Sequence, residues 1–484
     1  MNNDYGIQVL LAFLGWVPVL LLLFVVFPSR RAVIVGFIFA WLFLPVAKYE
    51  FEGFVDLDKV TATCLLIFLA TLFFDVNRVL TFRPNWVDIP MAVFCLAPLF
   101  ASVYNGLGLY DGFSEVRNQL FHWAFPYFIG RLYFSELKGM RELAIGIVLG
   151  GLVYVPLLLF ELRMSPQLHN IVYGFMQHSF LQTMRYGGWR PMVFLEHGLM
   201  VGMWMTAATL CAFMFWQMAG IKIVDYAPSF TIGHKLRNIR WPMWTVVALL
   251  FAITVLCKST FAIVLMLTGI GAMLAVKWFR AWYVVPLLSL VIVAYVVVRA
   301  LGWWDGQELV RVSNAVFGPE RAESLAYRLF NENILSARGR QQLVFGWGGW
   351  GRSRVDDEWG KEFVTDSSWV IYLGTTGMVG LLSFNLAMLL PALLLRFRIP
   401  PKYWTHPNAA PAVLFSILIV LWMLDNTMNN MFNPIFVLMA GGLAGLKRQL
   451  VPEDIRIINR AKPGAHAVKR KSRPIPAPAS QDRS

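Results

Sequence analysis

Long apolar stretches alternate with short polar connections along almost the whole chain. Window hydropathy indicates about thirteen stretches close to the ~20 residues that a helix needs to cross a bilayer. They lie near 7–27, 32–47, 60–75, 87–104, 119–134, 142–162, 191–216, 242–257, 259–277, 281–301, 368–395, 410–424 and 434–446. Because a spanning segment must satisfy its own backbone polar groups, the pattern predicts an all-α, polytopic bundle of about 12 to 13 transmembrane helices.

One long polar segment, residues 302–367, interrupts this pattern and is named here the polar loop. Within it, Pro319 to Arg338 has the spacing of an amphipathic helix, with Leu325 and Leu329 on one stripe. Arg321 is seven residues before Arg328, which stacks the two side chains in a column on that helix. We therefore expect an integral membrane domain over 1–446, with the polar loop inserted between two spans and containing short helices.

Composition agrees with a membrane domain, since 58% of residues are hydrophobic and 14% are charged, against about 25% in soluble proteins. Basic residues collect in every second short connection, which the positive-inside rule places in the cytoplasm. The N-terminus and the polar loop then lie outside, and the C-terminus lies inside. Residues 447–484 carry ten Lys/Arg against three Asp/Glu, and predict a disordered cytoplasmic tail attracted to anionic membrane lipid. No motif indicates nucleic-acid binding.

A titratable cluster lies at the start of the stretch 191–216. Pro191 suits the first turn of a helix, which would place Arg190 and His197 on one stripe with Glu196 beside them. Ionisable groups about two turns inside a span are costly and indicate a functional site. Arg190 would then bind an anionic headgroup, and Glu196 or His197 would accept a proton. A packing pair between Glu196 and one of its basic neighbours is the alternative.

Basic residues outside the membrane form a second candidate site. Lys258 lies in a predicted tight turn between two spans, where it either snorkels to the interface or binds a phosphate. The polar loop carries arginines around the segment Gly346-Trp-Gly-Gly-Trp-Gly351, namely Arg328, Arg338, Arg340, Arg352 and Arg354. Guanidinium groups pair with phosphate, glycines allow close backbone approach, and tryptophans such as Trp347 stack on sugars. The pattern favours a polyanionic ligand over a solvated connector.

Asp366 precedes the stretch 368–395 and has two interpretations. Either Asp366 or a neighbouring serine caps a helix that starts near Ser367, or Asp366 is a general base for a sugar hydroxyl. The four cysteines lack metal-ligand spacing, and the chain has no P-loop and no HExxH motif. We therefore expect neither a metal nor a cofactor.

Four segments resemble the superfamily of O-antigen ligases and O-antigen or exopolysaccharide polymerases, over about residues 60 to 445. They are Pro126-Tyr-Phe-Ile-Gly-Arg131, Gly188-Trp-Arg190-Pro-Met-Val-Phe, Leu256-Cys-Lys-Ser259-Thr-Phe-Ala, and Tyr327-Arg328 through Val344-Phe-Gly-Trp-Gly348 with Thr365-Asp-Ser and Gly374, Gly377 and Gly380. Ligases of that family place a histidine near the end of the large periplasmic loop. The corresponding region here has Asp366, which favours the polymerase branch.

The resemblance implies glycosyl transfer at the periplasmic face of a bacterial inner membrane. The donor would be an oligosaccharide on undecaprenyl pyrophosphate, and the acceptor a hydroxyl of another lipid-linked repeat unit. Arg190, Lys258 and the polar-loop arginines would bind the pyrophosphate, while Asp366, Glu196 or His197 would take the acceptor proton. Chain-length regulators and other polysaccharide assembly proteins would be partners. The alternatives are a ligase that transfers glycan to lipid A core and, in another class, a membrane transporter or flippase.

Overall fold

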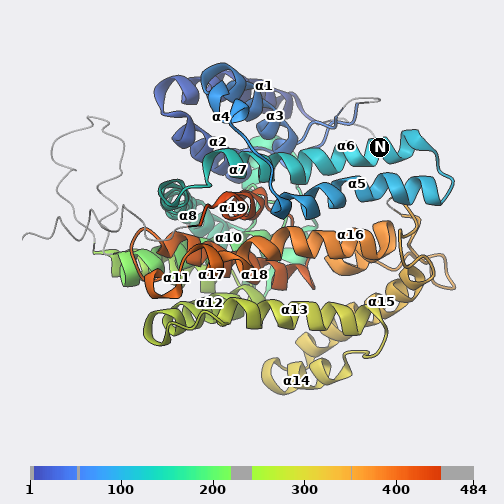
Figure 1. Cartoon of the computed structure of the whole chain (residues 1–484). Coiled ribbons are helices and arrows are strands. Elements are labelled where there is room, and N and C mark those ends of the chain that lie inside the picture. The colour runs from blue at the N-terminus through green and yellow to red at the C-terminus, as the bar shows by residue number, and fades with distance from the viewer. Residues whose placement is uncertain (1–4, 52–54, 220–241, 350, 449–484) are drawn as a thin grey trace, which may run out of the picture. The chain divides into compact units, whose positions relative to one another are not determined.

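The computed structural model describes residues 5–51, 55–219, 242–349 and 351–448 (Figure 1). The longer helices are α1 (Ile7–Val26), α2 (Ser29–Phe43), α3 (Lys59–Phe74), α5 (Ile89–Tyr104), α6 (Leu109–Gln119), α7 (Phe125–Tyr133), α8 (Leu137–Met164), α10 (Gly198–Met214), α11 (Met243–Leu256), α12 (Thr260–Phe279), α13 (Val284–Ala300), α14 (Gln307–Phe317), α15 (Pro319–Arg340), α16 (Ser368–Leu393), α18 (Ala410–Asn426) and α19 (Pro434–Gly445). Short helices are α4 (Val76–Leu80), α9 (Leu168–Tyr173), α17 (Leu395–Arg398), the 3-10 turns η1 (Trp86–Asp88), η3 (Phe180–Thr183) and η7 (Pro401–Tyr403), and the π-helical turns η2 (Leu120–Ala124) and η4 (Phe215–Ala219). Strands β1 (Met184–Arg185) and β2 (Gly188–Trp189) form an antiparallel hairpin.

The all-α class is confirmed, and a helix lies in each stretch that hydropathy selects. Six helical segments of the described chain are long and apolar enough to cross a membrane: Ile7–Val26, Trp86–Tyr104, Leu137–Met164, Gly198–Met218, Thr260–Phe279 and Ser368–Arg398. Five shorter apolar helices accompany them. The chain therefore has the helices of a multi-pass membrane protein. The predicted tail falls outside the described residues from position 449 onward.

The centre of the bundle is formed by α10, α18 and α19, whose residues are buried on all sides. Side chains on every face of these three helices therefore contact other parts of the bundle. Close approach of α7 to α19 depends on glycine, since a Cβ at Gly130 would overlap the carbonyl of Leu438 and one at Gly441 would overlap that of Tyr127. Small residues on both helices thus bring the two backbones into direct contact.

The polar loop contains two helices, α14 and α15, and the amphipathic helix predicted from Pro319 is confirmed as α15. A buried ion pair attaches α15 to the bundle, with Arg299 Nη2 of α13 2.7 Å from Glu332 Oε2. Glu332 also accepts hydrogen bonds from Tyr295 and from Ser367 at the start of α16. Because both charges are buried and hydrogen-bonded, loss of either partner would leave the other uncompensated.

The start of α10 differs from the prediction. The helix begins at Gly198 rather than near residue 191, and residues 190–197 form an irregular segment instead of its first two turns. Glu161 of α8 accepts hydrogen bonds from the backbone N–H groups of Met192 (2.8 Å) and Val193 (2.7 Å). Val193 also has a positive φ of 54°, which is incompatible with a right-handed helix.

His197 ends this irregular segment and caps α10, because its Nδ1 accepts the N–H of Leu199 at 3.0 Å. The expectation that Arg190 and His197 share a helical stripe is therefore wrong. Glu196 and His197 precede the helix and do not lie two turns inside it. The physical reason is that Val193, with its positive φ, interrupts a right-handed helix. Glu161 of α8 holds this irregular backbone by accepting the N–H groups of Met192 and Val193, which would otherwise be buried without partners.

Candidate functional site

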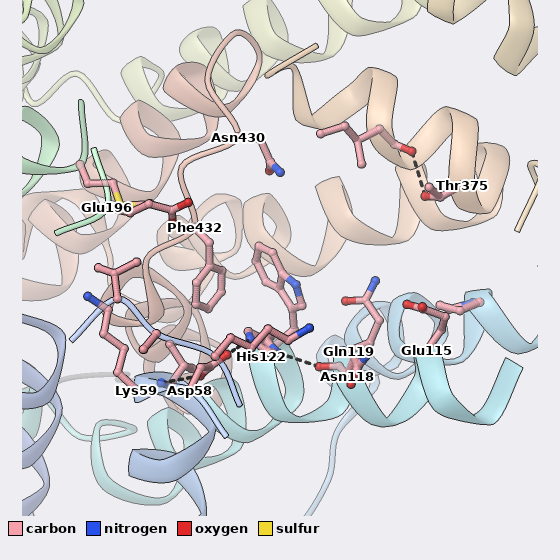
Figure 2. A pocket seen from close by; sticks show the side chains of 18 of the residues that line it. Asp58, Lys59, Glu115, Asn118, Gln119, His122, Glu196, Thr375, Asn430 and Phe432 are labelled. Atoms are coloured by element: carbon pink, nitrogen blue, oxygen red, sulfur yellow. Dashed lines mark hydrogen bonds and ion pairs between the residues drawn. The ribbon is translucent and has the colours of Figure 1, made fainter. Parts of the chain in front are cut away.

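A cavity of about 600 Å³ lies at one end of the bundle (Figure 2). Its walls come from the α2–α3 connection, α6 with η2, the residues around the start of α10, the first turns of α16, and the α18–α19 connection. Several aromatic side chains line it, including Trp41, Trp123, Tyr372 and Phe432. Its volume falls within the roughly 300–1,000 Å³ typical of sites for small organic ligands.

An ion pair between Asp58 and His122 forms one wall of the cavity. His122 Nε2 lies 2.7 Å from Asp58 Oδ2, and His122 Nδ1 lies 3.1 Å from the carbonyl oxygen of Asn118. Both partners accept, so the imidazole donates from both nitrogens and carries a positive charge. Burial opposes ionisation of Asp58, but the hydrogen bond and charge of His122 outweigh it and hold the pKa of Asp58 below its ordinary value.

Lys59 and Glu196 bring opposite charges to the cavity from two sides. The buried Lys59 Nζ donates to the carbonyl oxygens of Trp41 and Phe194, both at 3.2 Å, and lies 4.6 Å from the centre of the Trp41 ring. Figure 2 shows Glu196 and Asn430 on one side of the cavity, with Asp58, Lys59 and His122 on the other. Within the described residues, Lys59 makes no ion pair shorter than 4.0 Å.

Five basic residues gather beside the segment 190–197 and are named here the basic cluster: Arg185, Arg190, Lys258, Arg321 and Arg328. The hairpin β1–β2 presents Arg185, and its two turn residues, Tyr186 and Gly187, both have positive φ, as a two-residue type I′ turn requires. Lys258 links two members, because its Nζ donates to the Arg185 carbonyl (3.1 Å) while its own carbonyl accepts from Arg190 Nη2 (3.3 Å).

The basic cluster has too few acceptors for its donors. Arg190 is only 5% exposed, and the Nε atoms of Arg185 and Arg190 are buried without a hydrogen-bond partner in the described part of the chain. Burial and the positive charges of Arg185 and Arg321 lower the pKa of Arg190 to about 10. Buried arginines normally pair with carboxylates, but among the described residues only Arg328 of this cluster has a carboxylate partner, Asp366. The excess of positive charge suits a polyanionic ligand.

Arg328 and Asp366 connect the basic cluster to the cavity. Arg328 Nη1 donates to the carbonyl oxygen of Met428 at 3.0 Å and to Asn429, and its Nη2 lies 3.8 Å from Asp366 Oδ2. Asn430, which lines the cavity, donates its backbone N–H to the carbonyl of Asp366. Asp366 is half-exposed, and its side chain does not cap α16: Ser367 occupies the N-cap position, without a side-chain capping bond.

His197 directly follows Glu196 in the chain and lies beside the basic cluster. Burial, His178 and the charges of Arg190 and Arg328 lower the pKa of His197 to about 3. Its ring lies 4.8 Å from that of His178. His197 is therefore neutral at physiological pH, with Nδ1 already occupied as the cap of α10. Glu196, rather than His197, therefore offers carboxylate oxygens to the cavity, because they accept no hydrogen bond from the described residues.

The remaining predicted residues lie elsewhere. Arg338 stacks on Trp347 at 3.4 Å from the ring centre, and Trp347 Nε1 donates to the Arg338 carbonyl at 2.9 Å. Arg340 donates to the carbonyl of Ala300 at the end of α13. Arg352 pairs with Asp111 of α6 at 2.8 Å and lies against Gly349, which lines the cavity. The structure thus divides the predicted arginines between the basic cluster, the cavity rim and packing within the polar loop.

Sequence reasoning missed Arg185, Lys59 and the Asp58–His122 pair. A signal existed for two of them: His122 falls inside an apolar stretch, and Lys59 directly precedes another, where ionisable groups are costly. Nothing local indicates that these residues share one cavity, because they come from segments far apart in the chain. The chain matches no protein-family model, and a search of curated proteins finds no match to it.

Proposed function

We propose that this chain is a membrane glycosyltransferase that polymerises lipid-linked oligosaccharide repeat units at the periplasmic face of a bacterial inner membrane. The observation that carries the proposal is the basic cluster, in which buried arginine donors lack partners directly beside an aromatic-lined cavity. A lipid pyrophosphate supplies the anionic oxygens that these donors need. The adjoining cavity supplies polar and aromatic groups suited to sugar rings.

In the proposed reaction, the basic cluster holds the pyrophosphate of the donor, and the acceptor sugar occupies the cavity. The acceptor hydroxyl oxygen bonds to the anomeric carbon of the donor as the bond from that carbon to the pyrophosphate oxygen breaks. The bonding electrons leave with the lipid pyrophosphate, whose growing charge Arg190 and Arg328 stabilise. The hydroxyl proton passes to the carboxylate of Glu196, with Asp366 near Arg328 as the second carboxylate at the site.

The proposal also gives the chain an orientation. About thirteen helices cross the membrane, with the N-terminus and the polar loop in the periplasm and the C-terminus in the cytoplasm. The polarity of the connections supports this, since Arg30 and Arg78 lie at helix ends opposite to those that line the cavity. Arg280 likewise lies at the end of α12 opposite to Lys258 of the basic cluster. A periplasmic cavity is accessible to repeat units after they have crossed the membrane.

The test is to express Arg190→Met and Arg328→Met in a host that makes the glycan. We expect each variant to lose polymer by about a hundredfold or more, as removal of one transition-state donor typically does. Single undecaprenyl-linked repeats should accumulate in the periplasm. Lipid extraction with mass spectrometry measures the repeats, and gel analysis of the glycan measures the polymer.

Arg311→Met is the matched control, because Arg311 is a 75%-exposed arginine of the polar loop that pairs only with its neighbour Glu308 among the described residues. This variant should retain the polymer. Repeats accumulating on the cytoplasmic side would contradict the proposal and favour a flippase. Polymer that forms but is not attached to lipid A core would favour a ligase, and full polymer in both variants would refute the site.

A further inference from the structure

Lys59 is a buried charge in the cavity wall that makes no ion pair shorter than 4.0 Å within the described residues. It occupies the first position of α3, where the helix dipole disfavours a positive charge. It is also only 8% exposed, so its ammonium group has lost most of its hydration. An uncharged side chain would meet the packing needs of this position at lower cost. The stability of the fold therefore does not explain a lysine at this position, whereas the binding of an anionic ligand does.

The protein orients the ammonium group of Lys59 but does not provide acceptors for all three of its N–H donors. Two of its three N–H donors are held by the carbonyls of Trp41 and Phe194, and the indole of Trp41 covers one side. The third donor remains for the cavity that Lys59 lines. The carboxylate of the neighbouring Asp58 is already engaged by His122 and by the N–H groups of Val60 and Thr61.

We propose that the cavity selects an acceptor sugar bearing a carboxylate, such as a uronic acid, and that Lys59 is the specificity-determining residue that binds this group. This inference rests on the proposed function and adds the chemical class of the acceptor. A sugar carboxylate at Lys59 completes the hydrogen bonds of the ammonium and compensates its charge. The aromatic walls contact the sugar ring, and Asn118, Gln119 and Asn430 face its hydroxyls.

The position of Glu196 gives the carboxylate a second consequence. Lys59 and Glu196 approach the cavity from different walls (Figure 2), so a sugar held at its carboxylate presents a hydroxyl toward Glu196. Because Glu196 is negatively charged, it repels the carboxylate of the sugar. The sugar therefore binds in one direction only, with its carboxylate at Lys59. Lys59 thereby determines which hydroxyl loses its proton, and hence which linkage forms.

The inference is tested by direct binding, without catalysis. The full chain in lipid nanodiscs is titrated with a glucuronate-containing tetrasaccharide and with the same tetrasaccharide after its carboxyl groups are reduced to alcohols. Saturation-transfer NMR or calorimetry measures the two affinities. We expect wild type to bind the carboxylate form at least about tenfold more tightly, and Lys59→Met to lose this preference. Lys59→Arg, which keeps the charge, should retain part of it.

Lys48→Met is the matched control, since Lys48 also lines the cavity but is already paired with Glu50 (3.1 Å) and Asp56 (2.9 Å). This variant should keep the preference. Equal binding of both sugars by wild type would overturn the inference, even if Lys59→Met did not fold. Equal binding together with intact polymerisation would leave the proposed function standing. If the chain prefers the carboxylate form but does not polymerise repeat units, the proposed polymerase function is refuted and the binding site for an acidic sugar is still supported.

Discussion

Three buried charged groups illustrate different solutions to the cost of placing a charge in an apolar interior. Glu161 is surrounded by backbone N–H donors from Leu168, Met192 and Val193, so its carboxylate organises a segment of chain. Arg299 and Glu332 neutralise each other and attach the polar loop. Arg190 has neither arrangement, because its nearest charged neighbours are also basic. Its burial is thus explained best by a ligand rather than by the fold.

The low pKa of His197 leads to a prediction about stability. The folded value of about 3 lies below the ordinary value of about 6.5, so between these two pH values the unfolded chain binds more protons. Stability is therefore complete above pH 6.5 and falls as the pH decreases toward 3, by about 1.4 kcal/mol per pH unit. We expect wild type to lose about 1.4 kcal/mol in total between about pH 7.5 and pH 5.5 in detergent, because the full slope applies only below about pH 6.5.

His197→Asn is the informative comparison, since asparagine keeps a helix-capping side chain and does not titrate. Thermal melting at the two pH values should show a smaller decrease for the variant than for wild type. Histidines that do not contact His197, such as His169, contribute equally to both proteins and cancel in the difference. The same decrease in both proteins would mean that His197 is not the buried neutral group described above.

At the scale of elements, periodicity located the helices but not the start of α10. The spacing of apolar residues along a single segment predicts a helix. For α10, the predicted start rested on Pro191 alone. The actual start depends on Glu161, which is 31 residues from Met192 in the chain and acts through space. Because that contact is non-local, no reading of residues 190–200 by themselves could have revealed it. The same limit applied to Lys59 and His122.

The joint between the polar loop and α16 rests on one glycine. Gly377 has φ 63° and ψ −160°, a conformation open essentially to glycine alone, and a Cβ there would overlap the carbonyl of Val344. Around this kink, the N–H of Trp347 donates to Gly374 and that of Gly348 donates to Thr375, at 2.8 and 2.9 Å. The glycine-tryptophan segment that rims the cavity is thus held by the irregular backbone of α16.

Gly377→Ala should therefore destabilise the protein by about 1–3 kcal/mol, because the alanine is strained in φ and ψ and also clashes. Gly271→Ala is the control: this glycine lies inside α12, and a Cβ there meets nothing within 4 Å. Alanine at that position should be neutral or stabilising by up to about 1 kcal/mol. Thermal melting in the same detergent compares the two, and equal melting temperatures would contradict the role of the kink.

At the scale of the molecule, the fold assembles the site from helix ends and connections that are far apart in the chain. The α2–α3 and α18–α19 connections line the cavity together with the first turns of α16 and the residues around the start of α10, so its walls come from segments far apart in the chain. The basic cluster is built from the connections before α10 and α12 together with α15 at the same end of the bundle. Hydropathy and loop charge could predict this sidedness. They could not predict which side chains of so many separate segments meet.

The orientation of the whole chain can be tested because its four cysteines are buried, which leaves little background for thiol labelling. Trp359→Cys places a thiol in the polar loop at a 91%-exposed position, and Phe279→Cys places one at the opposite end of α12, at a 74%-exposed position. A membrane-impermeant maleimide should label Trp359→Cys in intact cells and Phe279→Cys only after the inner membrane is permeabilised. The reverse pattern would place the cavity and the basic cluster in the cytoplasm, where polymerisation of exported repeat units could not occur.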